Sequence, residues 1–376
     1  MIELTEIRKH FPLSADPSRF GLEKAEEARA FHRTLEGYAP TPLVKLTGLA
    51  GVLGIAGMYV KDESRRFGLN AFKALGGSFA MQKLTERADL PRAFVTATDG
   101  NHGRGVAWAA KRLGCEAHVY LPRGTAAERL ENIRALGARA EILDLSYDDT
   151  VRHAAAMAEK HGWCLIQDTA WPGYEEVPAL IMQGYTTMGL EAVEQLGDVK
   201  PTHIFLQAGV GAMAGAMTAF FADYYGSERP KIIVVEPEGA DCIFRTAEAD
   251  DGTLHFCGED MSTIMAGLCC GKPCTLGWEQ LRDYADFALA CPDSIAANGM
   301  RILASPRPGD SPIVSGESGA VTVGAVEALK RLRPDLCDVL GLDFNSVVLC
   351  ISTEGDTDRE NYRNVVWYGK YPDQII

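Results

Sequence analysis

The chain has 376 residues, 47% of them apolar, so it is long enough to fill two hydrophobic cores. Its net charge is −14 and it has no basic block, which argues against a nucleic-acid partner. Because it lacks an apolar run of about 18 residues and has an acidic N-terminus unlike a signal peptide, we expect no membrane contact and a cytoplasmic protein.

Charged, periodic residues predict a first helix over residues 23–38, before a break at the prolines near residue 41. Strand-like and helix-like segments then alternate. Strands are predicted over residues 93–100, 116–122 and 139–145, and helices over residues 103–114, 125–137 and 148–161. Thr125 is a suitable N-cap for its helix, and Gly137 follows the expected end.

The same alternation restarts after Gly184. Strands are predicted over residues 203–209, 231–237 and 347–352, and helices over residues 212–225 and 320–332. The strands are apolar along their whole length, which indicates parallel sheets covered on both faces. We therefore expect an α/β fold with two open, twisted, mainly parallel sheets flanked by helices, and a ligand site at the strand ends between two domains.

Five loops that follow strands are candidates for that site. They cover residues 97–105, 165–171, 207–216, 314–321 and 350–358. Each has an ordinary interpretation as a helix cap or a tight turn. The glycines of the third loop suit an anion at a helix N-terminus. Ala214 stands where a dinucleotide fingerprint needs glycine, and no Walker motif follows.

A lone lysine, Lys73, lies between Phe72 and a helix-like run that begins with Gly76-Gly77. It is either a surface lysine or a lysine held beside a covalent partner. The five loops after strands decide between these two interpretations of Lys73.

Taken in order, Phe72-Lys73, the Gly-Asn-His turn at residues 100–102, the glycine loop at residues 209–213 and Ser352 resemble the fold-type II pyridoxal-phosphate enzymes, the threonine dehydratase and tryptophan synthase β group. Within that group the chain is most similar to the diaminopropionate ammonia-lyase family. The resembling stretches include GLNAFKALGGSFA, TDGNHGRGVAWAA, QDTAWPGYEEVP, IMAGLCCGKP and STEGDTDRENYRNVVW.

The resemblance implies pyridoxal 5'-phosphate as cofactor and assigns residues to it. Lys73, next to Phe72, would form an imine with the cofactor aldehyde, and its freed amine would act as a base at Cα. Asn101 would bond the ring hydroxyl oxygen, and Ser352, or Thr353 in its place, would face the pyridine nitrogen. The phosphate would lie on backbone amides of Gly209, Val210, Gly211, Ala212 and Met213.

The resemblance also implies β-elimination of ammonia from D- and L-2,3-diaminopropionate, giving pyruvate and two ammonia. Asp99 stands where dehydratases have serine. Two carboxylates, Asp99 and Asp168, could attract the second ammonium of this substrate. We expect Lys73 to act as the base on one face of Cα and Asp99 on the other, while Asp168 helps to hold the β-amino group.

By the same resemblance, residues 1–78 and 189–376 would form the larger, cofactor-binding domain and residues 79–188 the smaller one, in a homodimer. We expect no metal site, because the dense cysteine cluster at residues 269–274 lacks a second pair of ligands at zinc spacing. A disulfide from Cys242 to Cys269 or Cys270 stays open.

Two alternatives remain. The first is a serine/threonine dehydratase-type β-elimination on the same fold, against which the aspartate at position 99 argues. The second is a non-catalytic ligand-binding protein that kept the scaffold; the retained Lys73, Asn101, glycine loop and Ser352 argue against that loss of activity.

Overall fold

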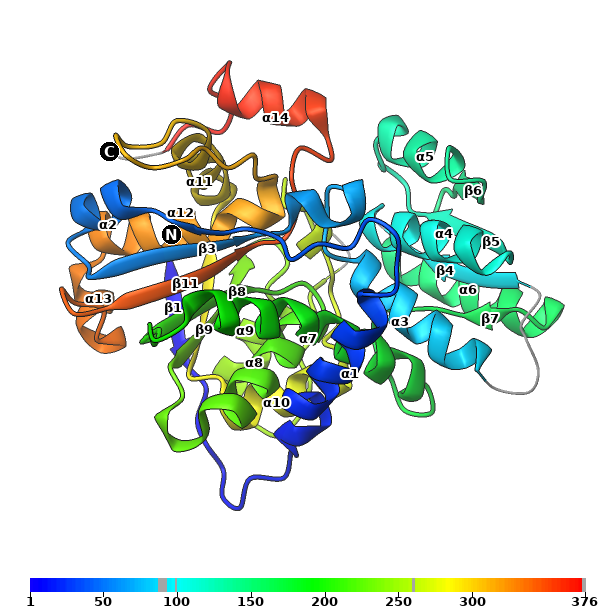
Figure 1. The fold of residues 1–376 in the computed structure, drawn as a ribbon, viewed down its shortest axis with the longest axis horizontal. Helices are drawn as coiled ribbons and strands as arrows, with labels where there is room; N and C mark the ends of the chain where they lie inside the picture. Colours follow the sequence, from blue (N-terminus) through cyan, green and yellow to red (C-terminus); the bar gives the residue numbers. More distant parts are fainter. Residues whose placement is uncertain (87–92, 99, 259–260, 374–376) are drawn as a thin grey trace.

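The computed structural model describes residues 1–86, 93–98, 100–258 and 261–373. In these residues the chain forms two β-sheets, a larger and a smaller one, and both have helices packed against them (Figure 1). The predicted α/β class with two mainly parallel sheets is therefore confirmed.

The larger sheet has seven strands in the order β1-β10-β9-β8-β11-β3-β2. In that order they are β1 (Glu3–Glu6), β10 (Phe287–Cys291), β9 (Lys231–Pro237), β8 (His203–Gln207), β11 (Val347–Ser352), β3 (Gly57–Asp62) and β2 (Leu43–Lys45). The two edge strands, β1 and β2, are antiparallel to their neighbours, and the strands between them are parallel. The carboxyl ends of the parallel strands therefore meet at one edge of the sheet.

The smaller sheet has four parallel strands in the order β6-β5-β4-β7. They are β6 (Arg139–Ile142), β5 (Glu116–Leu121), β4 (Ala93–Ala97) and β7 (Cys164–Leu165). Parallel strands need crossover connections, which here are helices.

Helices connect and cover both sheets. They are α1 (Leu22–His32), α2 (Thr47–Leu53), α3 (Ala74–Thr85), α4 (Asn101–Leu113), α5 (Ala127–Arg134), α6 (Tyr147–His161), α7 (Glu176–Leu196), α8 (Ala212–Tyr225), α9 (Cys242–Ala249), α10 (Thr275–Tyr284), α11 (Asp293–Ala304), α12 (Glu317–Leu332), α13 (Pro334–Leu340) and α14 (Arg359–Val366). Helices α4, α5 and α6 surround the smaller sheet (Figure 1).

The larger sheet separates two hydrophobic cores. Successive side chains of a strand point to opposite faces. In β8, Ile204 and Leu206 pack into the core beneath α7, α8 and α10, whereas Phe205 packs into the core beneath α2, α11 and α12. This burial on both faces explains why the middle positions of β8, β9 and β11 are apolar.

Several predicted elements are confirmed at both ends, namely β9, β11 and α8. The helix predicted over residues 23–38 is wrong beyond residue 32, where α1 ends. There the Thr34 hydroxyl bonds the Phe31 carbonyl, and Gly37 has a φ of +83°. The prediction of Thr125 as N-cap is also wrong, because its hydroxyl donates to the Pro122 carbonyl while Ala126 occupies the cap position of α5.

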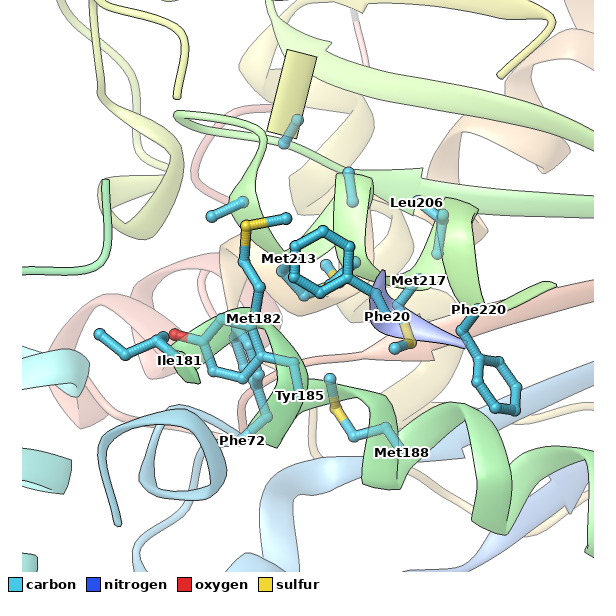
Figure 2. Close-up of a cluster of buried hydrophobic side chains, with 14 of the residues drawn as sticks. Phe20, Phe72, Ile181, Met182, Tyr185, Met188, Leu206, Met213, Met217 and Phe220 are labelled. Atoms are coloured by element: carbon cyan, nitrogen blue, oxygen red, sulfur yellow. The ribbon is translucent and has the colours of Figure 1, made fainter. Parts of the chain in front are cut away.

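Helices α3 and α7 touch at glycines. A Cβ on Gly184 of α7 would lie 2.6 Å from the Leu75 carbonyl oxygen of α3. Beside this contact the Phe72 ring packs on the Tyr185 ring, with centroids 4.8 Å apart, in a cluster that also holds Met182 and Met213 (Figure 2). The start of α3, where Lys73 lies, is thus fixed against α7. The domain limits expected after residues 78 and 188 fall inside these two continuous helices.

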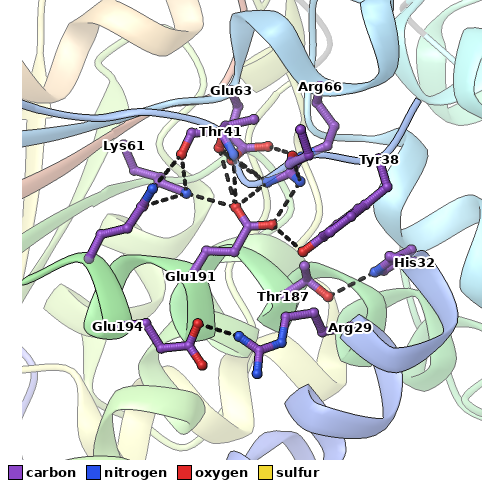
Figure 3. Close-up of polar contacts among 12 residues, drawn as sticks. Arg29, His32, Tyr38, Thr41, Lys61, Glu63, Arg66, Thr187, Glu191 and Glu194 are labelled. Atoms are coloured by element: carbon purple, nitrogen blue, oxygen red, sulfur yellow. Dashed lines mark hydrogen bonds and ion pairs between the residues drawn. The ribbon is translucent and has the colours of Figure 1, made fainter. Parts of the chain in front are cut away.

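A buried ion network ties α7 to β3 and to the 3-10 helix η2 (Glu63–Gly68) (Figure 3). Glu191 of α7 accepts hydrogen bonds from both terminal nitrogens of Arg66, each at 2.8 Å, and pairs with Lys61 at 2.7 Å. Glu63 accepts two further bonds from Arg66. All four side chains are at most 1% exposed. Burial alone would raise the pKa of Glu191, but Arg66 and Lys61 hold it well below its usual value.

We predict that Glu191→Gln lowers the free energy of unfolding by about 3–5 kcal/mol, because it leaves two buried cations with one carboxylate. The matched control is Glu194→Gln on the same helix, whose half-exposed side chain pairs with Arg29. That change should cost less than about 1 kcal/mol. Urea titration of the two variants measures both values, and similar losses in both would contradict the network's role.

Candidate active site

A cavity lies at the carboxyl ends of strands from both sheets. Each of the five loops predicted to form the site supplies at least one lining residue. The predicted site residues that line it are Phe72, Lys73, Asn101, Asp168, Gly209, Val210, Gly211, Ala212, Met213 and Thr353. Ser352 is fully buried behind this surface and does not line it. Asp99 lies outside the described residues.

Lys73 occupies the N-cap position of α3 and points its amine at Asp168, with which it forms an ion pair. Its backbone is held on two sides. The Phe72 amide donates to the Thr353 carbonyl at 3.1 Å, and a Cβ on Gly105 of α4 would lie only 3.0 Å from the Cα of Ala74. The lysine is therefore fixed by tight packing from both sheets, which a surface lysine would not need.

Asp168, in the loop after β7, is buried and ionised. Its Oδ2 lies 3.8 Å from Nδ1 of His102, and it pairs with Lys73. Burial on its own raises the pKa of a carboxyl group, but the charges of His102 and Lys73 outweigh it and lower the pKa of Asp168 to about 2. At neutral pH this carboxylate is thus a permanent negative charge beside the lysine.

The glycine loop after β8 leads directly into α8. Gly211 is the N-cap residue, with a φ of +86° that favours glycine. A Cβ on Gly209 would lie 3.1 Å from the Cα of Leu268, so the segment around residue 268 packs closely against the loop. The first backbone amides of α8 have no partner within the helix, and residues 209–214 line the cavity, so this turn is suited to bind an anion.

Hydroxyl and amide groups line the cavity near the end of β11. Thr353 accepts a hydrogen bond from Nε2 of Gln207 at 2.9 Å. Ser352 instead donates to Oγ of Ser315 at 2.7 Å. Asn101 donates through Nδ2 to Oε2 of Glu354. Of the two hydroxyls expected at the pyridine nitrogen, Thr353 is the one that reaches the cavity.

Glu317, at the start of α12, is a buried carboxyl group close to the buried carboxyl group of Glu354. Burial, and then the negative charge of Glu354, raise the pKa of Glu317 to about 7. Asn361 donates a hydrogen bond to it. Glu317 therefore gains or loses its proton near neutral pH.

We predict that stability falls as the pH rises from about 4.5 to about 7, because over this range the unfolded chain loses the Glu317 proton while the folded state still holds it. Its contribution is complete below about pH 4.5 and is lost as the pH passes about 7. Glu317→Gln should remove a part of this slope on the order of 3 kcal/mol. Urea titrations at pH 5 and pH 8 check it, with the exposed Glu360→Gln as control. An unchanged slope in Glu317→Gln would contradict the assignment.

The structure also bears on the cysteine and metal expectations. Cys242 is a free thiol that donates to the Gly209 carbonyl at 3.5 Å, so it is not joined to Cys269 or Cys270. In the described ranges, no three His, Cys, Asp or Glu side chains are grouped as a metal site. No helix within these ranges has the length and apolarity to cross a membrane.

Sequence reasoning assigned no site role to five polar residues that line the cavity, which are Thr98, His102, Tyr147, Gln207 and Glu354. Ser318 was assigned only to the cleft in general, through its loop. Gln207 is the last residue of β8, Glu354 lies just after β11, and Tyr147 is the first residue of α6, the helix that follows β6. Their position at or after strand ends was a usable signal, although no motif singled them out.

These residues fit pyridoxal phosphate. The positive φ at Gly211 and the close packing at Gly209 shape an anion cradle at a helix N-terminus. A lysine amine lies in the same cavity, and Thr353 presents a hydroxyl. Phosphate, aldehyde and ring nitrogen each have a suitable partner among them.

Comparison with known proteins agrees with this fit. The family model for pyridoxal-phosphate dependent enzymes matches residues 34–348. Diaminopropionate ammonia-lyase of Escherichia coli K12 is 49% identical over 373 residues, covering 94% of this chain and 93% of its own. The enzyme of the same name from Salmonella typhimurium LT2 is 47% identical, with 96% of each chain covered.

Solved structures of related enzymes are also similar to this chain in fold. The Escherichia coli enzyme in complex with an aminoacrylate-PLP azomethine reaction intermediate has a TM-score of 0.92 and 47% identity, covering 99% of this chain and 98% of its own. Its apo form has a TM-score of 0.85 at 43% identity, with 99% and 97% covered. This chain thus resembles the ligand-bound form more closely than the apo form. Tomato threonine deaminase, at 22% identity and a TM-score of 0.78 over 96% of this chain and 91% of its own, shares the fold.

Proposed function

This chain belongs to the pyridoxal-phosphate-dependent enzymes, in the group of the diaminopropionate ammonia-lyases, and we propose that it removes ammonia from 2,3-diaminopropionate by α,β-elimination. Elimination releases one ammonia, and water then hydrolyses the released aminoacrylate to pyruvate and a second ammonia. The observation that carries the proposal is the Lys73 amine, held against Asp168 in the same cavity as the glycine loop of α8.

Bound pyridoxal phosphate would supply the electron sink that stabilises a carbanion at Cα. The chain's own residues do the rest. Lys73 would hold the cofactor aldehyde and, once its amine is free, take the Cα proton on one face. Asp99 is proposed as the base on the other face, and Asp168 as a carboxylate that steadies Lys73 and helps to hold the β-amino group.

Cofactor binding follows from the same residues. The amides of Gly209–Met213 would receive the phosphate, with the dipole of α8 assisting. Asn101 would donate to the ring hydroxyl oxygen. Thr353, with Ser352 behind it, offers the ring nitrogen a hydroxyl, which cannot keep that nitrogen protonated as a carboxylate would. Such a site favours prompt loss of the β-substituent over transamination.

Three further proposals concern assembly and location. Residues 79–188 would form a smaller domain around the four-stranded sheet, and residues 1–78 and 189–376 a larger one around the seven-stranded sheet. The chain would work as a homodimer in the cytoplasm. Size-exclusion chromatography with light scattering tests the dimer, and the mass of a single chain would refute it.

The cofactor link is tested by borohydride trapping. In the holoenzyme, mass spectrometry should find the reduced cofactor on the peptide that contains Lys73. Lys73→Ala should lose the yellow absorption band and about 10³-fold or more of the rate of pyruvate formation. A label on another peptide, or on none, would refute the assignment.

Assays with serine and threonine decide between this function and the serine/threonine dehydratase alternative. A larger kcat/KM for threonine than for diaminopropionate would make the chain a dehydratase.

The two-base proposal makes a separate prediction about enantiomers. Asp99→Asn should reduce kcat on D-2,3-diaminopropionate by about 10²-fold or more, because one face of Cα loses its base. Turnover of the L-isomer, which uses the other face, should fall far less. Steady-state rates on both isomers measure the ratio, and equal losses would show that Asp99 is not specific to one face.

A further inference from the structure

Three neighbouring residues with side-chain acceptors line the cavity, and we name this group the acceptor corner: Gln207 with Oε1, Ser318 with Oγ and Glu354 with its carboxylate. All three residues are at least 96% buried. In the described part of the chain, Oε1 of Gln207 and Oγ of Ser318 have no hydrogen-bond partner. Buried polar atoms are normally satisfied, so these two indicate a missing ligand group.

The three residues are direct neighbours. The Ser318 amide donates to Oε1 of Glu354 at 3.2 Å, and Nε2 of Gln207 donates to the Ser318 carbonyl at 2.9 Å. Nε2 of Gln207 also faces the Ile351 carbonyl. Because carbonyls only accept, these contacts fix the amide so that its nitrogen faces them and its oxygen stays available.

The acceptor corner carries negative charge. Asn101 and Thr357 donate to Oε2 of Glu354, and the Ser318 amide donates to Oε1. A carboxylate has about four acceptor positions, so one remains on Oε1. Within the described residues, no lysine, arginine or histidine forms an ion pair with Glu354. The other described carboxylate that lines the cavity, Asp168, is already paired with Lys73.

A fitting group must therefore carry a positive charge and several N–H donors. We propose that the acceptor corner binds the second ammonium group of a 2,3-diamino acid and so determines specificity for a β-amino over a β-hydroxyl substrate. An ammonium has three N–H donors, one for each acceptor, and a charge that Glu354 balances. This inference rests on the proposed function and extends it. Asp168 is already paired with Lys73, so a second anionic group is needed to balance the charge of the β-ammonium.

The test compares two substrates in the holoenzyme. 2,3-Diaminopropionate carries the second ammonium, whereas β-chloroalanine has an uncharged leaving group at the same carbon. Ser318→Ala and Glu354→Gln should each lower kcat/KM for diaminopropionate at least about tenfold, mainly through KM, and change that for β-chloroalanine less than about threefold. The matched control is Thr218→Val, which removes a buried, unpartnered hydroxyl of α8 outside the cavity and should change neither.

Equal losses on both substrates, or no loss on either, would overturn the proposal. So would a shifted absorption spectrum of the resting enzyme with unchanged substrate preference, because the acceptors would then serve the cofactor ring.

A binding measurement separates this inference from the proposed function. In a Lys73→Ala background, calorimetry should show that Ser318→Ala weakens diaminopropionate at least about tenfold while serine binding is unchanged. If wild-type enzyme does not turn over diaminopropionate, the proposed function fails, and this titration still decides the acceptor corner. If ammonium chloride alone binds there as tightly as diaminopropionate does, the corner is an ion site and the proposal is overturned.

Discussion

The contact between Glu191 and the two cations Arg66 and Lys61 is the constraint on which the position of Lys73 depends. Glu191 belongs to α7, and the cations belong to β3 and η2, the segments that lead along the chain into Phe72 and Lys73. Buried charges are stable only when their partners are held in place, so this network allows little sliding of η2 along α7. The glycine contact between α3 and α7 fixes the other end of the same segment.

Much of the fold could be predicted because its signals are local. Apolar strands with helices between them were readable, and β9, β11 and α8 were correct at both ends. The edge strands β1 and β2 were not predicted, since each has only three or four residues and their pairing depends on distant partners. The end of α1 was misjudged for a similar reason, because a side-chain hydrogen bond at Thr34 competes with the helix.

The site was partly predictable for a different reason. Loops after parallel strands converge, so Lys73, Asn101 and Asp168 could be expected near one another. The acceptor corner could not be expected, because it depends on side-chain orientation. Gln207 lies in one of the predicted loops, but only the contacts of its amide nitrogen leave its oxygen as an available acceptor. The exchange of Ser352 for Thr353 at the cavity surface likewise depends on side-chain orientation, because Ser352, the last residue of β11, bonds Ser315 while Thr353 lines the cavity.

The short antiparallel strands at the two borders of the larger sheet have a consequence for the behaviour of the protein in concentrated solution. A long, flat border would offer unpaired backbone groups to a neighbouring molecule and invite aggregation. Here one border is a strand of four residues with glutamate at both ends, and the other a strand of three residues that ends in lysine. Both are too short and too charged to recruit a further strand, so the protein should tolerate crowding without forming intermolecular β-structure.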